Sequence, residues 1–193
     1  MRIGIFGGTF NPPHMGHLIL AQWVWEELTL DRVLFVPAAK PPHKIGVPAI
    51  ASDTHRVAMV KHAIALNNAL ELSEVEIERD GVSFTIDTVK SLAEKFSSAE
   101  LFLLIGADNL ADFHTWRDPE GICKLAKLVV MHRAGFSLSS VDRRWHQYVI
   151  PIQTPIIEIS STEIRERLKQ GKSIRYLVPD SVAEYILEHR LYV

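Results

Sequence analysis

Four short runs of consecutive apolar residues alternate along the chain with segments in which apolar residues recur every three or four positions. Unbroken apolar runs of this length are typical of parallel strands that are buried on both faces. The spacing between them is typical of amphipathic helices that connect such strands. The pattern therefore predicts an α/β fold with a mostly parallel central sheet and helices on both faces. The predicted strands cover residues 3–6, 33–36, 101–105 and 128–131, with a further strand around 70–77.

Helix start signals place helices between and after these strands. Residues 18–28 and 86–96 have the helical spacing, and Ser52 or Asp53 can cap a helix that runs to about residue 66. Later, Ser161 or Thr162 is expected to cap a helix, and a final helix is expected over 179–189. The Pro-rich stretch at 37–48 predicts a functional loop that borders the site. The pattern leaves the structure of residues 135–154 open.

The composition fits one folded domain over residues 1–193, with 47% apolar and 23% charged residues. The formal charge is −2, from 21 basic and 23 acidic residues, so we expect no broad positive surface and no nucleic-acid partner. One cysteine, Cys123, cannot form an intramolecular disulfide, and the apolar run at residues 1–6 is too short for a signal peptide or a membrane span. We therefore expect a cytoplasmic protein without membrane association, and the sequence leaves homo-oligomer formation open.

Candidate phosphate chemistry lies where the first predicted strand ends and the first helix begins, in Gly7-Gly8-Thr9-Phe10-Asn11-Pro12-Pro13-His14-Met15-Gly16-His17. In open α/β sheets, ligands bind at the carboxyl ends of strands, and a helix N-terminus there offers N–H groups to an anion. Gly7 and Gly8 would let the backbone approach a phosphate closely, and Thr9 could donate from its hydroxyl. His14 and His17 would share one face of the helix and could both donate to one anion.

Three other interpretations of the Gly7–His17 segment fit its residues less well. A purely structural turn would not explain the position between a strand and a helix, and a zinc pair would need a third ligand that the neighbouring sequence does not contain. A dinucleotide fingerprint requires the spacing G-x-G-x-x-G, which these glycines do not have. Gly171-Lys172-Ser173 is not a P-loop, because the earlier glycine of that motif would fall on Glu166.

The segment from Gly7 to His17 resembles the signature of the nucleotidyltransferase superfamily whose core is H-x-G-H, with Asn11 where members commonly have Asp. Ile159-Ser160-Ser161-Thr162-Glu163-Ile164-Arg165 resembles the I-S-S-T-x-I-R element of the same superfamily. The resemblance implies a Rossmann-like nucleotidyltransferase fold, in which the helical part at about 160–193 completes the ATP site. It implies catalytic roles for His14, His17 and Arg165, and ATP binding by these three with Gly7, Gly8, Thr9, Phe10, Gly106, Asp108, Ser161 and Thr162.

Elements in the middle of the chain resemble those of nicotinate-nucleotide adenylyltransferases. They are Gly81-Val82-Ser83-Phe84-Thr85-Ile86-Asp87-Thr88, the Ile105-Gly106-Ala107-Asp108 element, the Phe113-His114-Thr115-Trp116 element, and a P-x-x-x-P-P-H-K loop from Pro37 to Lys44. By that resemblance Trp116 stacks on the pyridine ring, His43 closes its other face and Thr85 helps to hold the nicotinate carboxylate. Lys44 and Arg133 are candidates for the acceptor phosphate, and Lys40 belongs to the same loop.

The activity implied is transfer of AMP from ATP to nicotinate mononucleotide. The acceptor phosphate is already an anionic nucleophile, so alignment and charge neutralisation should supply the catalysis, with Mg²⁺ carried by the ATP phosphates rather than by direct protein ligands. The alternatives are another H-x-G-H enzyme, such as one that acts on phosphopantetheine, and a nucleotide-binding module without turnover. The choice between the nicotinate and nicotinamide mononucleotides stays open, since no isolated charge in the sequence is dedicated to it.

Overall fold

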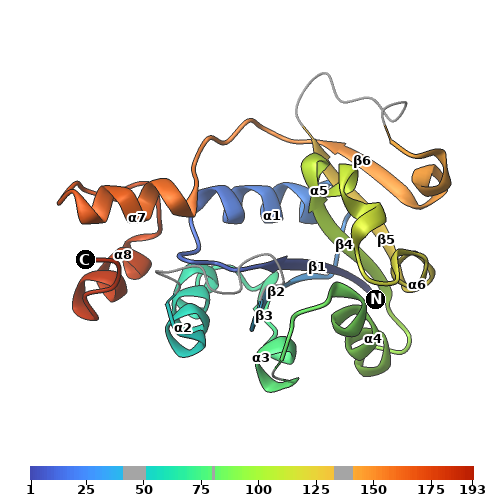
Figure 1. The fold of residues 1–193 in the computed structure, drawn as a ribbon, viewed down its shortest axis with the longest axis horizontal. Coiled ribbons are helices and arrows are strands. Elements are labelled where there is room, and N and C mark those ends of the chain that lie inside the picture. The colour runs from blue at the N-terminus through green and yellow to red at the C-terminus, as the bar shows by residue number, and fades with distance from the viewer. Residues whose placement is uncertain (41–50, 80, 133–140) are drawn as a thin grey trace.

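The computed structural model describes residues 1–40, 51–79, 81–132 and 141–193 of the chain. A parallel sheet formed by the described residues has six strands in the order β3-β2-β1-β4-β5-β6 (Figure 1). The strands are β1 (Arg2–Gly8), β2 (Arg32–Pro37), β3 (Leu70–Leu72), β4 (Glu100–Gly106), β5 (Ala126–His132) and β6 (Val149–Gln153). The predicted α/β fold with a parallel central sheet is therefore confirmed, and its strand order is that of doubly wound dinucleotide-binding folds.

Helices connect the strands and extend beyond them. They are α1 (Met15–Glu27), α2 (Asp53–Ile64), α3 (Val75–Arg79), α4 (Thr85–Lys95), α5 (Ala107–Ala111), α6 (Pro119–Leu125), α7 (Ser161–Lys169) and α8 (Asp180–Glu188), with 3-10 helices η2 (Phe113–Thr115) and η4 (Arg143–Tyr148). No helix within the described ranges is long and apolar enough to cross a membrane.

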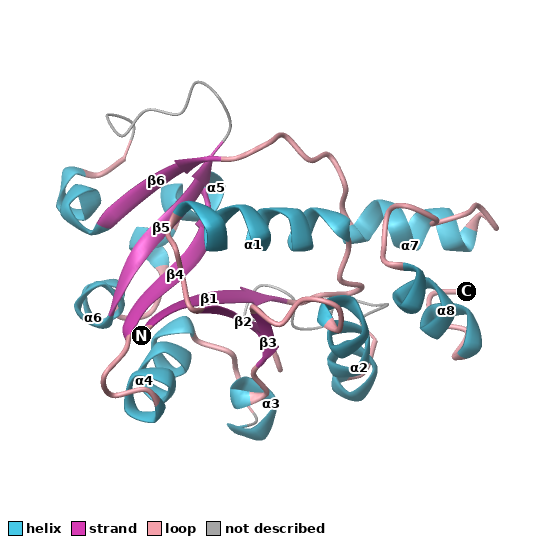
Figure 2. Cartoon of the chain, turned by 180° about the vertical axis from the view of Figure 1, so that it is seen from behind, coloured by secondary structure: helices cyan, strands magenta, loops and turns pink. Residues whose placement is uncertain are grey.

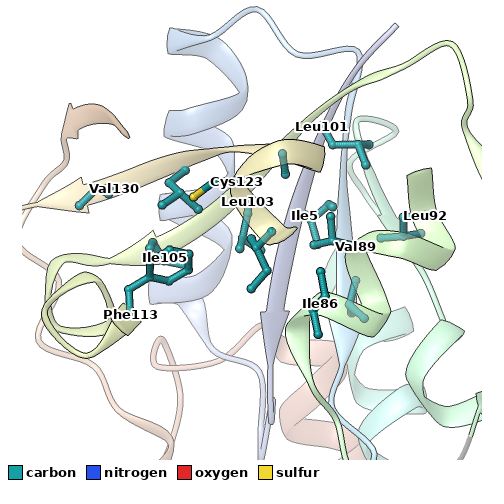
Figure 3. Close-up of a cluster of buried hydrophobic side chains, with 14 of the residues drawn as sticks. Ile5, Ile86, Val89, Leu92, Leu101, Leu103, Ile105, Phe113, Cys123 and Val130 are labelled. Carbon is teal, nitrogen blue, oxygen red and sulfur yellow. The ribbon is translucent and has the colours of Figure 1, made fainter. Parts of the chain in front are cut away.

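The two faces of the sheet are covered by different helices because side chains alternate along each strand. Phe6 packs with Val24 of α1 and Val60 of α2. On the opposite face, Ile3 and Ile5 pack with residues of α4 and α6. Figure 3 shows this second cluster, in which Ile86, Val89 and Leu92 of α4 meet Leu101, Leu103 and Ile105 of β4. The helices on both faces bury the sheet, as the unbroken apolar strands predict.

Helices α7 and α8 form a third cluster beside α2, away from β5 and β6 (Figures 1 and 2). Ile164 and Leu168 of α7 and Val182 and Ile186 of α8 are buried together with Met59 of α2. Because α2 belongs both to this cluster and to the α1 side of the sheet, it joins the last helices to the strand ends. This packing brings the start of α7 next to the start of α1.

Three differences separate the structure from the sequence predictions. The strand expected around 70–77 ends at Leu72, and residues 75–79 form α3. The alternation of acidic and apolar residues in Val75-Glu76-Ile77-Glu78 resembles a strand, but these residues form a helix in which Glu76 is buried. The cap of α7 is Ser160, whose side chain accepts from the Glu163 amide at 3.1 Å, so Ser161 and Thr162 are the first helical residues. Strand β6 lies in the part of the sequence that showed no clear pattern.

Candidate active site

The candidate site lies where β1 and β4 end side by side and their connections leave toward opposite faces of the sheet. Ligands of open α/β sheets bind at such a switch point. A cavity of about 210 Å³ opens there, and its walls include Gly7, Gly8 and Gly106 from the strand ends. A second cavity, of about 320 Å³, lies between α7 and α8 and contains none of the predicted site residues.

The segment from Gly7 to His17, which we call the glycine-histidine loop, leaves β1 beneath a buried aromatic ring. Phe10 has a left-handed backbone (φ 47°), and its side chain is 2% exposed. Its ring lies 5.0 Å from the His17 ring in an edge-on arrangement and 5.4 Å from the Phe35 ring. Phe10 therefore anchors the loop in the core below His17, and contact between Phe10 and ATP would have to come from its main chain.

The two histidines of the loop lie face to face at the start of α1. Their rings stack with centroids 3.6 Å apart, which confirms that the spacing places both on one side of the helix. The main-chain N–H of His14 donates to Nδ1 of His17 at 3.1 Å. Since Nδ1 accepts, a neutral His17 carries its proton on Nε2 and presents that N–H as a donor. Gly16 permits the stack, because a Cβ there would lie 3.1 Å from Nδ1 of His14.

Burial keeps both imidazoles neutral. It lowers the pKa of His14 to about 4, and burial together with the neighbouring His14 lowers the pKa of His17 well below its usual value. Nδ1 of His14 is buried and has no hydrogen-bond partner among the described residues. The Met15 amide at the helix start donates to the Leu177 carbonyl at 2.9 Å, so it is not free for an anion as the sequence suggested. The imidazole N–H groups are the side-chain donors that remain at the start of α1.

Helix α7 is fastened to the glycine-histidine loop. Nη1 of Arg165 donates to the Asn11 carbonyl at 2.9 Å, and Nη2 donates to Oγ1 of Thr162 at 3.2 Å. The Ser161 hydroxyl donates to the Pro12 carbonyl at 2.8 Å. A guanidinium has five N–H donors, so Arg165 can hold the loop and still reach a phosphate. The structure thus brings together the two superfamily elements that lie about 150 residues apart in the sequence.

Arg56, which the sequence analysis did not single out, holds the loop from α2. Its side chain is fully buried and donates to the carbonyls of Thr9 at 2.9 Å, Ala51 at 3.2 Å and Ala39 at 3.4 Å. It also contacts the Asp53 carboxylate, which balances part of its charge. A buried cation with this many acceptors ties the glycine-histidine loop to the ends of β2 and the start of α2. Its position within a helical pattern gave no signal of this role.

The cavity of about 210 Å³ at the switch point also contains the predicted acceptor residues Thr85 and Trp116. Thr85 is the first residue of α4, and Trp116 follows η2 and packs on Phe113 with centroids 5.3 Å apart. Glu76, which the sequence did not indicate as a site residue, also lines this cavity. Its Oε1 accepts from the Thr88 hydroxyl at 2.6 Å, whereas its buried Oε2 has no partner among the described residues.

The remaining predicted site residues do not line the cavity or lie outside the described residues. Asp108 is exposed in the first turn of α5 and does not line the cavity, although its carboxylate would collide with a Cβ at Gly106. Lys40 is exposed, and its main chain pairs with the segment around Ser83, whose hydroxyl accepts from the Ala39 amide at 2.9 Å. Three further predictions, on His43, Lys44 and Arg133, lie outside the described residues.

Because His14 is buried and neutral, the free energy of unfolding should depend on pH. The unfolded chain takes up this proton near pH 6.5 and the folded chain only near pH 4, so the unfolding free energy should fall as the pH drops between these values. The fall attributable to His14 is about 3 kcal/mol. Urea unfolding of the ligand-free protein at a series of pH values measures it. His14→Gln should flatten the dependence, whereas His114→Gln, at an exposed position on η2, should not; an equal slope in wild type and His14→Gln would contradict the assignment.

Comparisons with known proteins agree with this geometry. The family model described as cytidylyltransferase-like matches residues 5–167. A probable nicotinate-nucleotide adenylyltransferase of Lactiplantibacillus plantarum is 45% identical over 192 residues, which are 99% of this chain and 88% of that relative. A probable nicotinate-nucleotide adenylyltransferase of Thermus thermophilus is 45% identical over 193 residues, which are 100% of this chain and 100% of that relative.

A solved structure shows the same fold. The nicotinic acid mononucleotide adenylyltransferase of Plasmodium falciparum, complexed with NaAD, matches 99% of this chain and 97% of its own with a TM-score of 0.78 at 20% identity. The Rossmann-like nucleotidyltransferase fold implied by the two superfamily elements is therefore confirmed. With a switch-point cavity, a histidine pair at the start of α1 and full-length relatives at this identity, the chain belongs to the nicotinate-nucleotide adenylyltransferase family.

Proposed function

We propose that the protein transfers AMP from ATP to nicotinate mononucleotide and releases pyrophosphate. The observation that carries the proposal is the position of the histidine pair and the cavity at the end of one strand, β1. His14 and His17 start α1 on one face of the sheet, and the cavity with Thr85 and Trp116 opens beside Gly7 and Gly8. An ATP α-phosphate held by the histidines would lie next to an acceptor in the cavity.

The reaction needs charge neutralisation more than acid–base chemistry. An oxygen of the acceptor phosphate forms a bond to the α-phosphorus, the bond from that phosphorus to the bridging oxygen breaks, and pyrophosphate leaves with the electron pair. The Nε2–H of His17 and the guanidinium of Arg165 are donors suited to the negative charge that builds up on these oxygens. Because the loop is held by Arg56, Arg165 and Ser161, the donors are already oriented before ATP binds.

The cavity suits a flat, negatively charged ring. Trp116 offers an aromatic face for stacking. Thr85 is at the N-terminus of α4, an 11-residue helix whose macrodipole favours an anion at that end. The carboxylate of nicotinate would gain from this field, and the neutral carboxamide of nicotinamide would gain less. Glu76 acts in the opposite direction, since its carboxylate faces the same cavity.

Mg²⁺ enters this proposal with the triphosphate. The protein groups that face the ATP side are imidazole, guanidinium and hydroxyl donors, which suit phosphate oxygens, whereas Mg²⁺ prefers oxygen ligands. The phosphates of ATP would therefore hold the ion, and Arg165 and the histidines would bind the same phosphates from the protein side. Bound in this way, Mg²⁺ would neutralise charge on the leaving pyrophosphate. A cytoplasmic location is also part of the proposal, supported by the free and buried Cys123.

The reaction is tested by pyrophosphate release with ATP and Mg²⁺ against three acceptors, namely nicotinate mononucleotide, nicotinamide mononucleotide and phosphopantetheine. We expect the highest kcat/KM with nicotinate mononucleotide. A higher value with phosphopantetheine would favour another H-x-G-H enzyme. ATP binding without pyrophosphate release from any acceptor would favour a nucleotide-binding module. Either result would overturn the proposed acceptor.

His17→Ala should lower kcat by about two orders of magnitude or more, as expected for loss of a donor that acts in the transition state. The substitution removes the acceptor of the His14 amide, so the thermal midpoint should fall, but the Asn11 and Thr9 attachments keep the loop in place and the protein should stay folded. Steady-state kinetics with saturating ATP measures the effect, and His62→Ala, an exposed histidine on α2, is the matched control. Full turnover by His17→Ala would remove this side chain from the mechanism.

Glu76→Gln should raise the preference for nicotinate over nicotinamide mononucleotide about fivefold or more. The change removes a negative charge from the cavity and keeps an oxygen that can accept from Thr88. The measured quantity is the ratio of the two kcat/KM values. Glu78→Gln, at an exposed position on the same helix, should leave the ratio unchanged. If Glu76→Gln lowers the ratio or does not move it, the substituent of the pyridine ring does not enter this cavity.

A further inference from the structure

Asn11 is attached to the rest of the protein through its side-chain oxygen. Oδ1 accepts from the Ala51 amide at 3.0 Å and from the Tyr192 hydroxyl at 2.7 Å, and the residue is 5% exposed. A carbonyl oxygen has two lone pairs, so these two donors satisfy it. Position 11 therefore serves the fold as a hydrogen-bond acceptor, and a negative charge is not needed for that purpose.

The main chain of the same residue holds Arg165. The Asn11 carbonyl accepts from Nη1 of Arg165, and the next carbonyl, that of Pro12, accepts from Ser161. Any displacement of Asn11 would therefore move the acceptor that orients Arg165, and it would shift the loop three residues before His14. The side chain and the main chain of Asn11 connect Tyr192 to the ATP side of the site.

Tyr192 is held in a fixed position by its surroundings. It has a left-handed backbone (φ 67°), which is unfavourable in a residue with a side chain and persists only where packing enforces it. Its ring packs against the α2–α7–α8 cluster, with the hydroxyl 4.0 Å from Sδ of Met59. Burial raises the pKa of this hydroxyl, while the nearby Arg165 and Arg56 act to lower it. The protonated hydroxyl is the form that can donate to Asn11.

We propose that Tyr192 is a positioning residue for adenylyl transfer. Its hydroxyl fixes Asn11, and Asn11 fixes the guanidinium of Arg165 and the approach to His14. The segment after α8 thus acts on the ATP phosphates through two hydrogen bonds, without touching them. The proposal rests on the proposed function only for the identity of the reaction, because the chain of contacts is present in the protein itself.

Tyr192→Phe is the direct test, since it removes one oxygen and keeps the ring in its cluster. We expect kcat to fall about tenfold, because small displacements of phosphate-binding groups cost that much or more. The KM for nicotinate mononucleotide should stay within about twofold, because the acceptor cavity does not include the Asn11 region. Tyr185→Phe is the matched control. Its hydroxyl bonds His55 at 2.9 Å at the contact between α8 and α2, and its loss should leave kcat unchanged.

Substitutions at Asn11 separate positioning from general stability. Asn11→Asp keeps an acceptor for the Tyr192 hydroxyl, so Tyr192→Phe should lower kcat about tenfold relative to Asn11→Asp alone. Asn11→Ala removes the acceptor, so Tyr192→Phe should have no further effect there. Wild-type kcat in Tyr192→Phe would overturn the proposal. So would losses that multiply in the double variant with Asn11→Ala, because they would show two independent effects. Should Asn11→Ala fail to fold, the Asn11→Asp pair still decides the outcome.

Binding of an ATP analogue with a non-hydrolysable α,β bridge, measured by calorimetry, gives a readout independent of turnover. Tyr192→Phe should weaken binding about fivefold, and Tyr185→Phe should not. If the wild-type protein releases no pyrophosphate with any acceptor while Tyr192→Phe still weakens analogue binding, the proposed function fails and the positioning role stands. If turnover is normal and analogue binding is unchanged in Tyr192→Phe, the positioning role fails and the proposed function stands.

Discussion

The structure depends on how the glycine-histidine loop satisfies its carbonyl groups. A loop that turns donors toward an anion must turn carbonyls the other way, and buried carbonyls without partners are costly. Here the carbonyls of Thr9, Asn11 and Pro12 accept from Arg56, Arg165 and Ser161. These donors come from α2 and α7, so the local geometry of the loop is fixed by distant parts of the chain. The third cluster, which packs α7 and α8 on α2, is therefore part of the site's support.

Two helices start at the same strand edge and serve different substrates in the proposed reaction. Helix α1 follows β1 and lies on one face of the sheet, whereas α4 precedes β4 and lies on the other. The neighbouring ends of β1 and β4 therefore have a helix start on each side. One start carries the histidine pair, and the other carries Thr85 beside the cavity. An in-line transfer needs nucleophile and leaving group on opposite sides of phosphorus, and a switch point between two faces suits that requirement.

The sequence predicted the features that depend on local pattern. The four clear apolar strands, the helix with Ser52 or Asp53 as its cap and the placement of His14 and His17 on one side of α1 follow from short-range spacing. All three are confirmed, with Ser52 as the cap. Arg56 and Tyr192 could not be predicted, because their contacts join residues 47 and 181 positions apart. Glu76 was missed since its acidic and apolar neighbours alternate as in a strand. Such alternation cannot show that one carboxylate turns inward to meet Thr88.

The neutral side chain at position 11 bears on the electrostatics of the proposed ATP site. Superfamily members commonly have Asp there, and a carboxylate beside Arg165 would offset part of the positive charge that faces a triphosphate. Asn11 provides the acceptor that Ala51 and Tyr192 need without that offset. In the proposed reaction the guanidinium of Arg165 would then keep more of its field for the phosphates of ATP, and Arg56 keeps Asp53 as its carboxylate partner. The amide at this position would therefore separate two tasks in the proposed reaction, because it provides the hydrogen bonds of the loop while the positive charge of Arg165 stays available to ATP.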